Sequence, residues 1–159
     1  MSYVIATREV PEQPVMSIRE HAAMARISEF MGGAFEELYG HAGRTGVVTL
    51  GPPFVIYHAF DPSDVDAEVC IPIVGAADPA GRITTRVVPA ATVAHTLHVG
   101  PYDKLKIAYD AIQAWVAEQG LEVAGPYREH YLTGPEVPPD QIRTEIELPV
   151  VPVPVVAGA

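Results

Sequence analysis

The chain has 159 residues, which is enough for one domain but not for two ordinary independent domains. Its apolar content of 48% can fill a hydrophobic core, and this excludes an intrinsically disordered chain. Ten Lys and Arg against twenty Asp and Glu leave a net charge of −10, so the chain repels the phosphates of nucleic acids. We therefore expect no direct nucleic-acid partner.

Cysteine usage and the N-terminal residues indicate a location in the cell. The single cysteine, Cys70, excludes an internal disulfide framework and a Cys-based zinc site, and it fits a reducing cytosol. The first residues lack the basic and apolar segments of a secretory signal, and no apolar run approaches the ~20 residues of a membrane helix. The sequence therefore predicts a cytoplasmic protein without a membrane partner. The histidine spacing indicates no metal, and we expect no cofactor.

The first half of the chain predicts the order strand, helix, strand, strand. A β-branched segment bounded by prolines predicts a strand over residues 10–19. A helix is predicted from Ala22 to Tyr39, and strands over residues 51–60 and 67–74. The helix prediction rests on apolar residues at steps of three and four: Met24, Ile27, Met31, Ala34 and Leu38.

The second half predicts the same order of elements. A strand over residues 88–99 ends at Gly100, and Pro101 then has the fixed φ that suits a first helical turn. Gly120 is placed to stop the helix. Strands are predicted over residues 128–132 and 144–151. The helix prediction rests on one apolar stripe: Leu105, Ala108, Tyr109, Ile112 and Val116.

Three short matches in the same order show that the two halves are copies of one unit. REVPEQPV from Arg8 matches RVVPAATV from Arg86. GPPFVIYHAF matches GPYREHYLTG, which places Tyr57 on Tyr131, 74 positions later. DAEVCIPIV matches RTEIELPVV, which places Glu68 on Glu145. We expect one domain with a first repeat over about 3–76, a second over about 82–151 and a Pro-rich tail over 150–159.

These elements predict an α+β fold with pseudo-twofold symmetry, in which both helices cover one face of a largely antiparallel sheet. Strand residues alternate between faces, so Ile146 and Leu148 point to one side and Glu145 to the other. The same alternation separates Glu68 from its apolar neighbours. With the apolar sides under the helices, both glutamates lie on the helix-free face, where we expect a ligand cleft.

The run HVGPYDKLKIAYDAIQAWVAEQG, followed by GPYREHYL and RTEIELPV, resembles the GyrI-like small-molecule-binding domain. The resemblance covers Tyr3–Val150 and includes the duplicated unit. The same module is the effector-binding domain of BmrR-type multidrug-responsive activators. It implies binding of amphipathic, cationic or aromatic ligands in a cleft between the repeats. The chain has no room for the DNA-binding and coiled-coil segments of those activators and resembles the stand-alone members.

The resemblance also implies a set of ligand-binding residues. An acidic residue on the last strand of the second copy contacts the ligand's positive charge, and only Glu145 matches it; Glu68 is its counterpart. The aromatic lining maps onto Tyr57, Trp115 and Tyr131, whose ring faces suit an organic cation. Each of these residues also has an interpretation that involves structure alone. Glu145 is also interpretable as a solvated strand residue, Glu68 as an ion-pairing residue, Trp115 as core, and the two tyrosines as half-buried with bonded hydroxyls.

Three functions follow from the resemblance, and the binding of hydrophobic cations is favoured. The alternative is hydrolysis of cyclopropane-bearing, DNA-alkylating natural products, in which Glu145 would orient or deprotonate water and Tyr131 or Trp115 would position the ligand. The weakest is modulation of DNA gyrase, because the acidic residues are scattered along the chain. The oligomeric state stays open.

Overall fold

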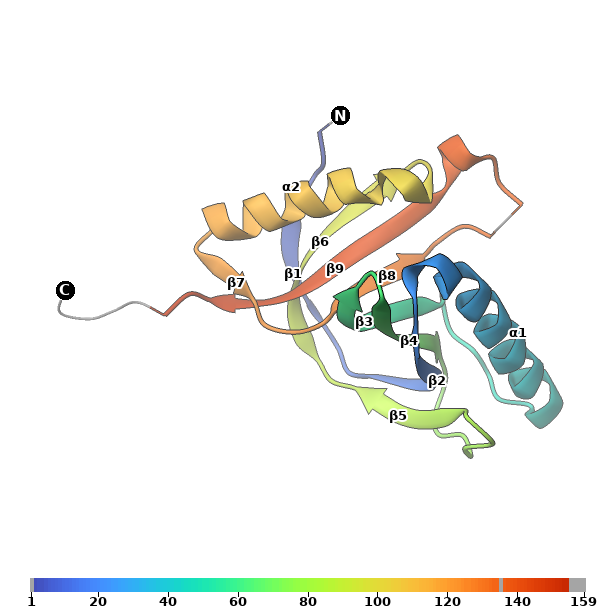
Figure 1. The fold of residues 1–159 in the computed structure, drawn as a ribbon. Coiled ribbons are helices and arrows are strands. Elements are labelled where there is room, and N and C mark those ends of the chain that lie inside the picture. Colours follow the sequence, from blue (N-terminus) through green and yellow to red (C-terminus); the bar gives the residue numbers. More distant parts are fainter. Residues whose placement is uncertain (1, 135, 155–159) are drawn as a thin grey trace.

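The computed structural model describes residues 2–134 and 136–154. In these residues nine strands form one sheet, and two α-helices pack against it (Figure 1). The last five residues of the Pro-rich tail lie outside this range. The sheet order is β1-β6-β9-β8-β3-β4-β2-β5, with β7 on β9, and all pairings are antiparallel. The elements are β1 (Ala6–Val10), β2 (Gln13–Ala22), α1 (Ile27–Thr45), β3 (Phe54–Asp61), β4 (Asp64–Pro72), β5 (Thr84–Val88), β6 (Ala91–Val99), α2 (Leu105–Glu118), β7 (Leu121–Val123), β8 (Tyr127–Tyr131) and β9 (Arg143–Pro152).

The strand register confirms the pseudo-twofold relation between the repeats. The first repeat contributes β2, α1, β3 and β4, and the second contributes β6, α2, β8 and β9. The repeats meet where β3 pairs with β8, and Val55 lies opposite Glu129. The flanking pairs are Phe54 with His130 and Ile56 with Arg128. The 74-position equivalence exchanges these two flanking pairs, so the axis passes between Val55 and Glu129.

Two strands are exchanged between the repeats. β1 lies at the start of the first repeat but pairs with β6 of the second, while β5 lies at the start of the second repeat but pairs with β2 of the first (Figure 1). Arg8 of β1 forms hydrogen bonds with Glu145 and Glu147, and Arg86 of β5 bonds to Glu68 at 2.6 and 2.8 Å. Equivalent arginines thus tie each exchanged strand to the opposite repeat.

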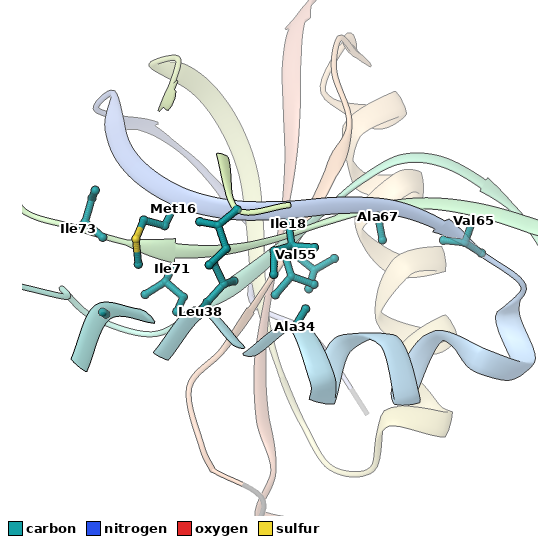
Figure 2. Close-up of a cluster of buried hydrophobic side chains, with 12 residues drawn as sticks. Met16, Ile18, Ala34, Leu38, Val55, Val65, Ala67, Ile71 and Ile73 are labelled. Carbon is teal, nitrogen blue, oxygen red and sulfur yellow. The ribbon is translucent and has the colours of Figure 1, made fainter. Parts of the chain in front are cut away.

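Both helices pack on one face of the sheet, as the alternation predicts. Figure 2 shows the core under α1, where Ala34 and Leu38 of the helix meet side chains of the sheet such as Ile18, Val55 and Ile71. A second core lies under α2 and includes Ile146 and Leu148. One transverse row of the sheet runs through Val69, Val55, Glu129 and Ile146, so the two cores share this face.

The helix prediction was accurate for α2 and shifted for α1. A 3₁₀ turn follows Pro101 before α2, and Gly120 adopts a φ of +70° after it. α1 begins five residues later than expected, at Ile27, because β2 continues to Ala22 through its pairing with β4. It ends at Thr45, and Gly46 follows with a φ of +77°. About six strands were expected, and the three missed are β1, β5 and β7.

Within the described residues, the two helices lack the combination of length and apolar character that a membrane crossing requires.

Candidate functional site

Three tyrosine hydroxyls converge on the carboxylate of Glu129 at the pseudo-twofold axis. Tyr109 donates a hydrogen bond to Oε2 at 2.6 Å, and Tyr131 donates one to Oε1 at 2.8 Å. The hydroxyl of Tyr57 lies 3.5 Å from Oε1. Glu129 is only 7% exposed. The carboxylate is therefore enclosed largely by the hydroxyl groups of aromatic side chains.

The elements around the axis explain this convergence. Glu129 and Tyr131 are two residues apart on β8 and share a strand face. Tyr57 is the equivalent of Tyr131 in the first repeat. It reaches the same place from β3, because the pseudo-twofold axis relates the two residues. Tyr109 comes from α2, on the helix stripe that packs against the second core. Both repeats and a helix thus contribute to one polar centre.

A wider group of aromatic and sulfur-containing side chains surrounds this centre. Phe35 of α1 packs edge-on against Tyr131, with ring centroids 6.2 Å apart, and Tyr102 does the same at 6.1 Å. The Sδ atom of Met31 lies 4.0 Å from the Tyr57 hydroxyl. The three hydroxyls around Glu129 are therefore surrounded by apolar and aromatic groups from α1, from the 3₁₀ turn before α2 and from the sheet.

Burial controls the protonation of this group. Burial raises the pKa of Glu129, and the hydrogen bonds from Tyr109, Tyr131 and Tyr57 offset only part of that effect. Burial, reinforced by the nearby carboxylate charge, also raises the pKa of each of the three tyrosines. The hydroxyls therefore remain donors. Within the described residues no Lys, Arg or His forms an ion pair with Glu129.

An open groove of about 350 Å³ adjoins the tyrosine cluster. Tyr57, His58, Phe60 and Tyr127 line it, together with Ala59 and the turn at residues 125–126. A second hollow of about 310 Å³ lies away from this cluster, beside the end of α1, and His41 and Asp78 are among its lining residues. The described residues contain no group of three or more His, Cys, Asp or Glu that could hold a metal ion.

The structure brings together only two of the residues that the sequence singled out. Tyr57 and Tyr131 both contact Glu129. Trp115 is partly buried against the core beneath α2 instead. Glu145 lies on the helix-free face, where it is paired with Arg8 and its Oε1 is 3.5 Å from Nδ1 of His95.

Glu68 also lies on the helix-free face, within a dense ion-pair network. Its carboxylate accepts hydrogen bonds from Arg86 and from the Ser17 hydroxyl at 2.7 Å, and it lies 2.8 Å from Nε2 of His58. Burial opposes its ionisation, but the bonds from Arg86, Ser17 and His58 outweigh burial and lower the pKa to about 2. Glu68 is thus a charged, internally neutralised group.

Sequence reasoning missed Glu129 and Tyr109. The signal for Glu129 was its position two residues before Tyr131, which places both on one strand face. Tyr109 was assigned to the packing stripe of its helix, and the stripe itself is correct. The sequence pattern does not show where the pseudo-twofold axis lies. The position of that axis brings Glu129 and Tyr109 together between the two repeats.

Comparison with known proteins agrees with this architecture. The family model of the GyrI-like small-molecule-binding domain matches residues 4–151. The crystal structure of the EcmrR C-terminal domain aligns with a TM-score of 0.81 and 27% identity, covering 96% of this chain and 100% of that one. EcmrR in its complex with DNA aligns with a TM-score of 0.83 and 27% identity, over 95% of this chain. The chain spans 58% of the length of that EcmrR chain.

More distant proteins share the fold. A hydrolase encoded by lin2189 from Listeria innocua aligns at 15% identity with a TM-score of 0.72, over 92% of this chain and 91% of that one. SAV2435 bound to tetraphenylphosphonium aligns at 15% identity with a TM-score of 0.59, over 95% and 94%. No curated protein matches the chain. The family match over nearly the whole chain, together with the paired repeats, shows that this chain belongs to the GyrI-like small-molecule-binding domain family.

Proposed function

We propose that the chain binds amphipathic organic cations between α1 and α2, with Glu129 as the counter-charge. The observation that supports this is a carboxylate that is 7% exposed, bonded to three tyrosines, and without an ion pair to any described basic residue. A carboxylate buried without a cationic partner is costly, and a ligand cation would offset that cost. A neutral ligand would leave the charge uncompensated.

The aromatic surroundings suit the apolar part of such a ligand. The rings of Tyr57, Tyr109 and Tyr131 surround the carboxylate, and a ring face in contact with a bound cation would contribute ~0.5–2 kcal/mol. Ring and thioether surfaces adapt to different shapes, which favours a range of ligands over a single one. The proposed ligand class is therefore defined by charge and apolar area.

Glu145 remains the counter-ion predicted from the sequence, and one titration separates it from Glu129. In the structure Glu145 is paired with Arg8, so a cation would have to compete with that guanidinium. Tetraphenylphosphonium is a suitable ligand for the titration, because SAV2435 shares the fold and carries it. Triphenylphosphine oxide is a neutral control of similar apolar character.

The experiment measures both compounds by calorimetry against wild type, Glu129→Gln and Glu145→Gln. We expect E129Q to weaken tetraphenylphosphonium binding at least about tenfold, to spare the phosphine oxide, and E145Q to bind as wild type does. Thermal unfolding checks that both variants fold. Equal cation affinity in wild type and E129Q would show that Glu129 is not the counter-ion. A loss of cation affinity in E145Q alone would assign the counter-ion role to Glu145 on the helix-free face.

Hydrolysis of strained-ring alkylating compounds is the second candidate. The observation that favours it is the raised pKa of Glu129, because a general base or acid near neutral pH needs such a carboxyl. In that reaction Glu129 would take a proton from water as the water oxygen bonds to one ring carbon and the cyclopropane bond opens. The electron pair of the broken bond would remain with the other part of the ligand, which would then receive the proton back from Glu129, so that the net change is the addition of one water. Product in excess of protein, lost in E129Q, would establish turnover. Product limited to one equivalent would indicate sequestration.

A further inference from the structure

The groove beside Tyr57 arises where β3 outruns its partner strand. Tyr57 pairs with Tyr127, the first residue of β8, and this is the last pair between the two strands. β3 then continues to Asp61 on β4 alone, after an irregularity between Tyr57 and Ala59. One edge of β3 is therefore uncovered over this stretch, and the turn at residues 125–126 forms the opposite wall.

The walls of this groove are mainly aromatic. Phe60 is 57% exposed and packs edge-on against Tyr57, with ring centroids 5.5 Å apart. Tyr127 lies across the groove. His58 also lines the groove, but its Nε2 lies 2.8 Å from Glu68, which holds the imidazole toward the helix-free face. An exposed phenylalanine beside two tyrosines is suited to stacking on a flat ring.

Tyr57 connects this groove to the buried carboxylate. Its ring forms part of the groove wall, while its hydroxyl lies 3.5 Å from Glu129. The other two hydroxyls are closer, at 2.6 Å for Tyr109 and 2.8 Å for Tyr131. Tyr57 is thus the most weakly held of the three donors. Turning its side chain costs the least hydrogen bonding and joins the groove to the site.

We propose that the groove is an aromatic subsite of the same binding site. Its occupant is the planar ring system of an elongated ligand, stacked between Phe60 and Tyr127, while the cationic end of that ligand reaches Glu129 past a displaced Tyr57. This inference rests on the proposed function. The volume of about 350 Å³ suits a single fused ring system, at the lower end of the range for ligand pockets.

The test compares two cations that differ in one arm. The first is tetraphenylphosphonium, which is compact, and the second is a triphenylphosphonium cation that carries naphthalene on a short methylene linker. The variant is Phe60→Ala, an exposed position whose truncation leaves both cores intact. The matched control is Tyr102→Ala, because Tyr102 is also about half exposed and packs edge-on against Tyr131 away from the groove.

We expect F60A to weaken the naphthalene compound about fivefold and to leave tetraphenylphosphonium within twofold, whereas Y102A affects both compounds alike. A second variant, Ala59→Phe, fills the groove and should exclude the naphthalene arm while sparing the compact cation. If both compounds bind and F60A and A59F change them equally or not at all, the subsite is refuted and the proposed function stands. If neither compound binds the wild type, the proposed function and the subsite fail together.

Discussion

Val55 and Glu129 lie opposite each other in the β3–β8 pair, where the pseudo-twofold axis passes between them. Each of the two residues is therefore the symmetry equivalent of the residue it pairs with. The first repeat supplies an apolar side chain there and the second a charged one. Two carboxylates so close together would repel each other, and both could not ionise. With valine in the first repeat, a single negative charge lies at the centre, between the equivalent residues Tyr57 and Tyr131.

Restoring symmetry at the axis should therefore be harmful. We expect Val55→Glu to destabilise the protein at neutral pH by at least about 3 kcal/mol, because it places a second carboxylate at a fully buried position beside Glu129. The loss should be smaller at pH 4, where one carboxyl binds a proton. Urea unfolding at both pH values measures this, with Val55→Leu as the control for a change in volume. Equal losses at the two pH values would contradict charge repulsion.

Cation binding should depend on pH through Glu129. Because burial raises the pKa of this carboxyl above its ordinary value, affinity for tetraphenylphosphonium should increase as pH rises through that pKa. Tyr109→Phe removes a donor that stabilises the charged form and should move the midpoint to higher pH. Calorimetry over a range of pH, in buffers that differ in ionisation enthalpy, should detect proton release on binding. Affinity that is independent of pH in wild type would contradict this assignment.

Removing the buried charge should stabilise the protein without ligand. A carboxyl whose pKa is raised by folding contributes stability at low pH that is lost as pH rises through the folded-state pKa. Glu129→Gln removes this loss, so we expect a higher Tm than wild type at pH 8 and little difference at pH 4. Such an exchange of stability for function is common at binding sites. A Tm at pH 8 below that of wild type would show that Glu129 serves the fold.

Acid should weaken the helix-free face by the opposite route. Burial opposes ionisation of Glu68, but the bonds from Arg86, Ser17 and His58 outweigh it and hold its pKa at about 2. The stability it contributes is present above its unfolded pKa near 4.5 and is lost as pH falls toward 2.

We therefore expect Glu68→Gln to cost about 3 kcal/mol at pH 7 and to flatten the acid side of the stability profile. Glu36→Gln is the matched control, because Glu36 is an exposed residue of α1. Denaturant unfolding from pH 7 to pH 2 checks both variants. An E68Q protein that keeps the acid dependence of wild type would exclude Glu68 as its source, and would direct attention to Glu147, whose pKa is also lowered to about 2.

The sequence predicted the repeats and the sheet faces because both depend on local periodicity. Ile146 and Leu148 alternate with glutamates in a way that only a half-buried strand explains, and the structure buries them under α2. β1 and β5 were missed as separate strands because they are short and because a strand's own pattern does not say which repeat it joins. Their pairing is decided by contacts between residues far apart in the sequence, such as Arg8 with Val93 for β1 and Val15 with Arg86 for β5.

The aromatic part of the candidate site was predicted better than its charge. Tyr57 and Tyr131 emerged from the match between repeats, and they do meet in space. Glu129 lies between Arg128 and His130, so its strand is polar on both faces and gives no alternation to mark one of them as buried. Arg128 is itself buried on the opposite face, and its Nε atom finds no hydrogen-bond partner within the described residues. Which face of β8 is turned toward the helices can therefore be determined only from the positions of the neighbouring strands and helices.

The exchange of β1 and β5 restricts how the protein can open. β1 completes the half of the sheet that contains β6, but the chain continues from β1 into β2 of the other half. β5 likewise pairs with β2, and the chain continues from β5 into β6, so the two halves hold each other together. Separating the halves would break the β3–β8 ladder and would also pull β1 from β6 and β5 from β2, together with the ion pairs of Arg8 and Arg86. Under the proposed function, a ligand would therefore enter by side-chain rotation or by a shift of one helix, and not by separation of the two halves of the sheet.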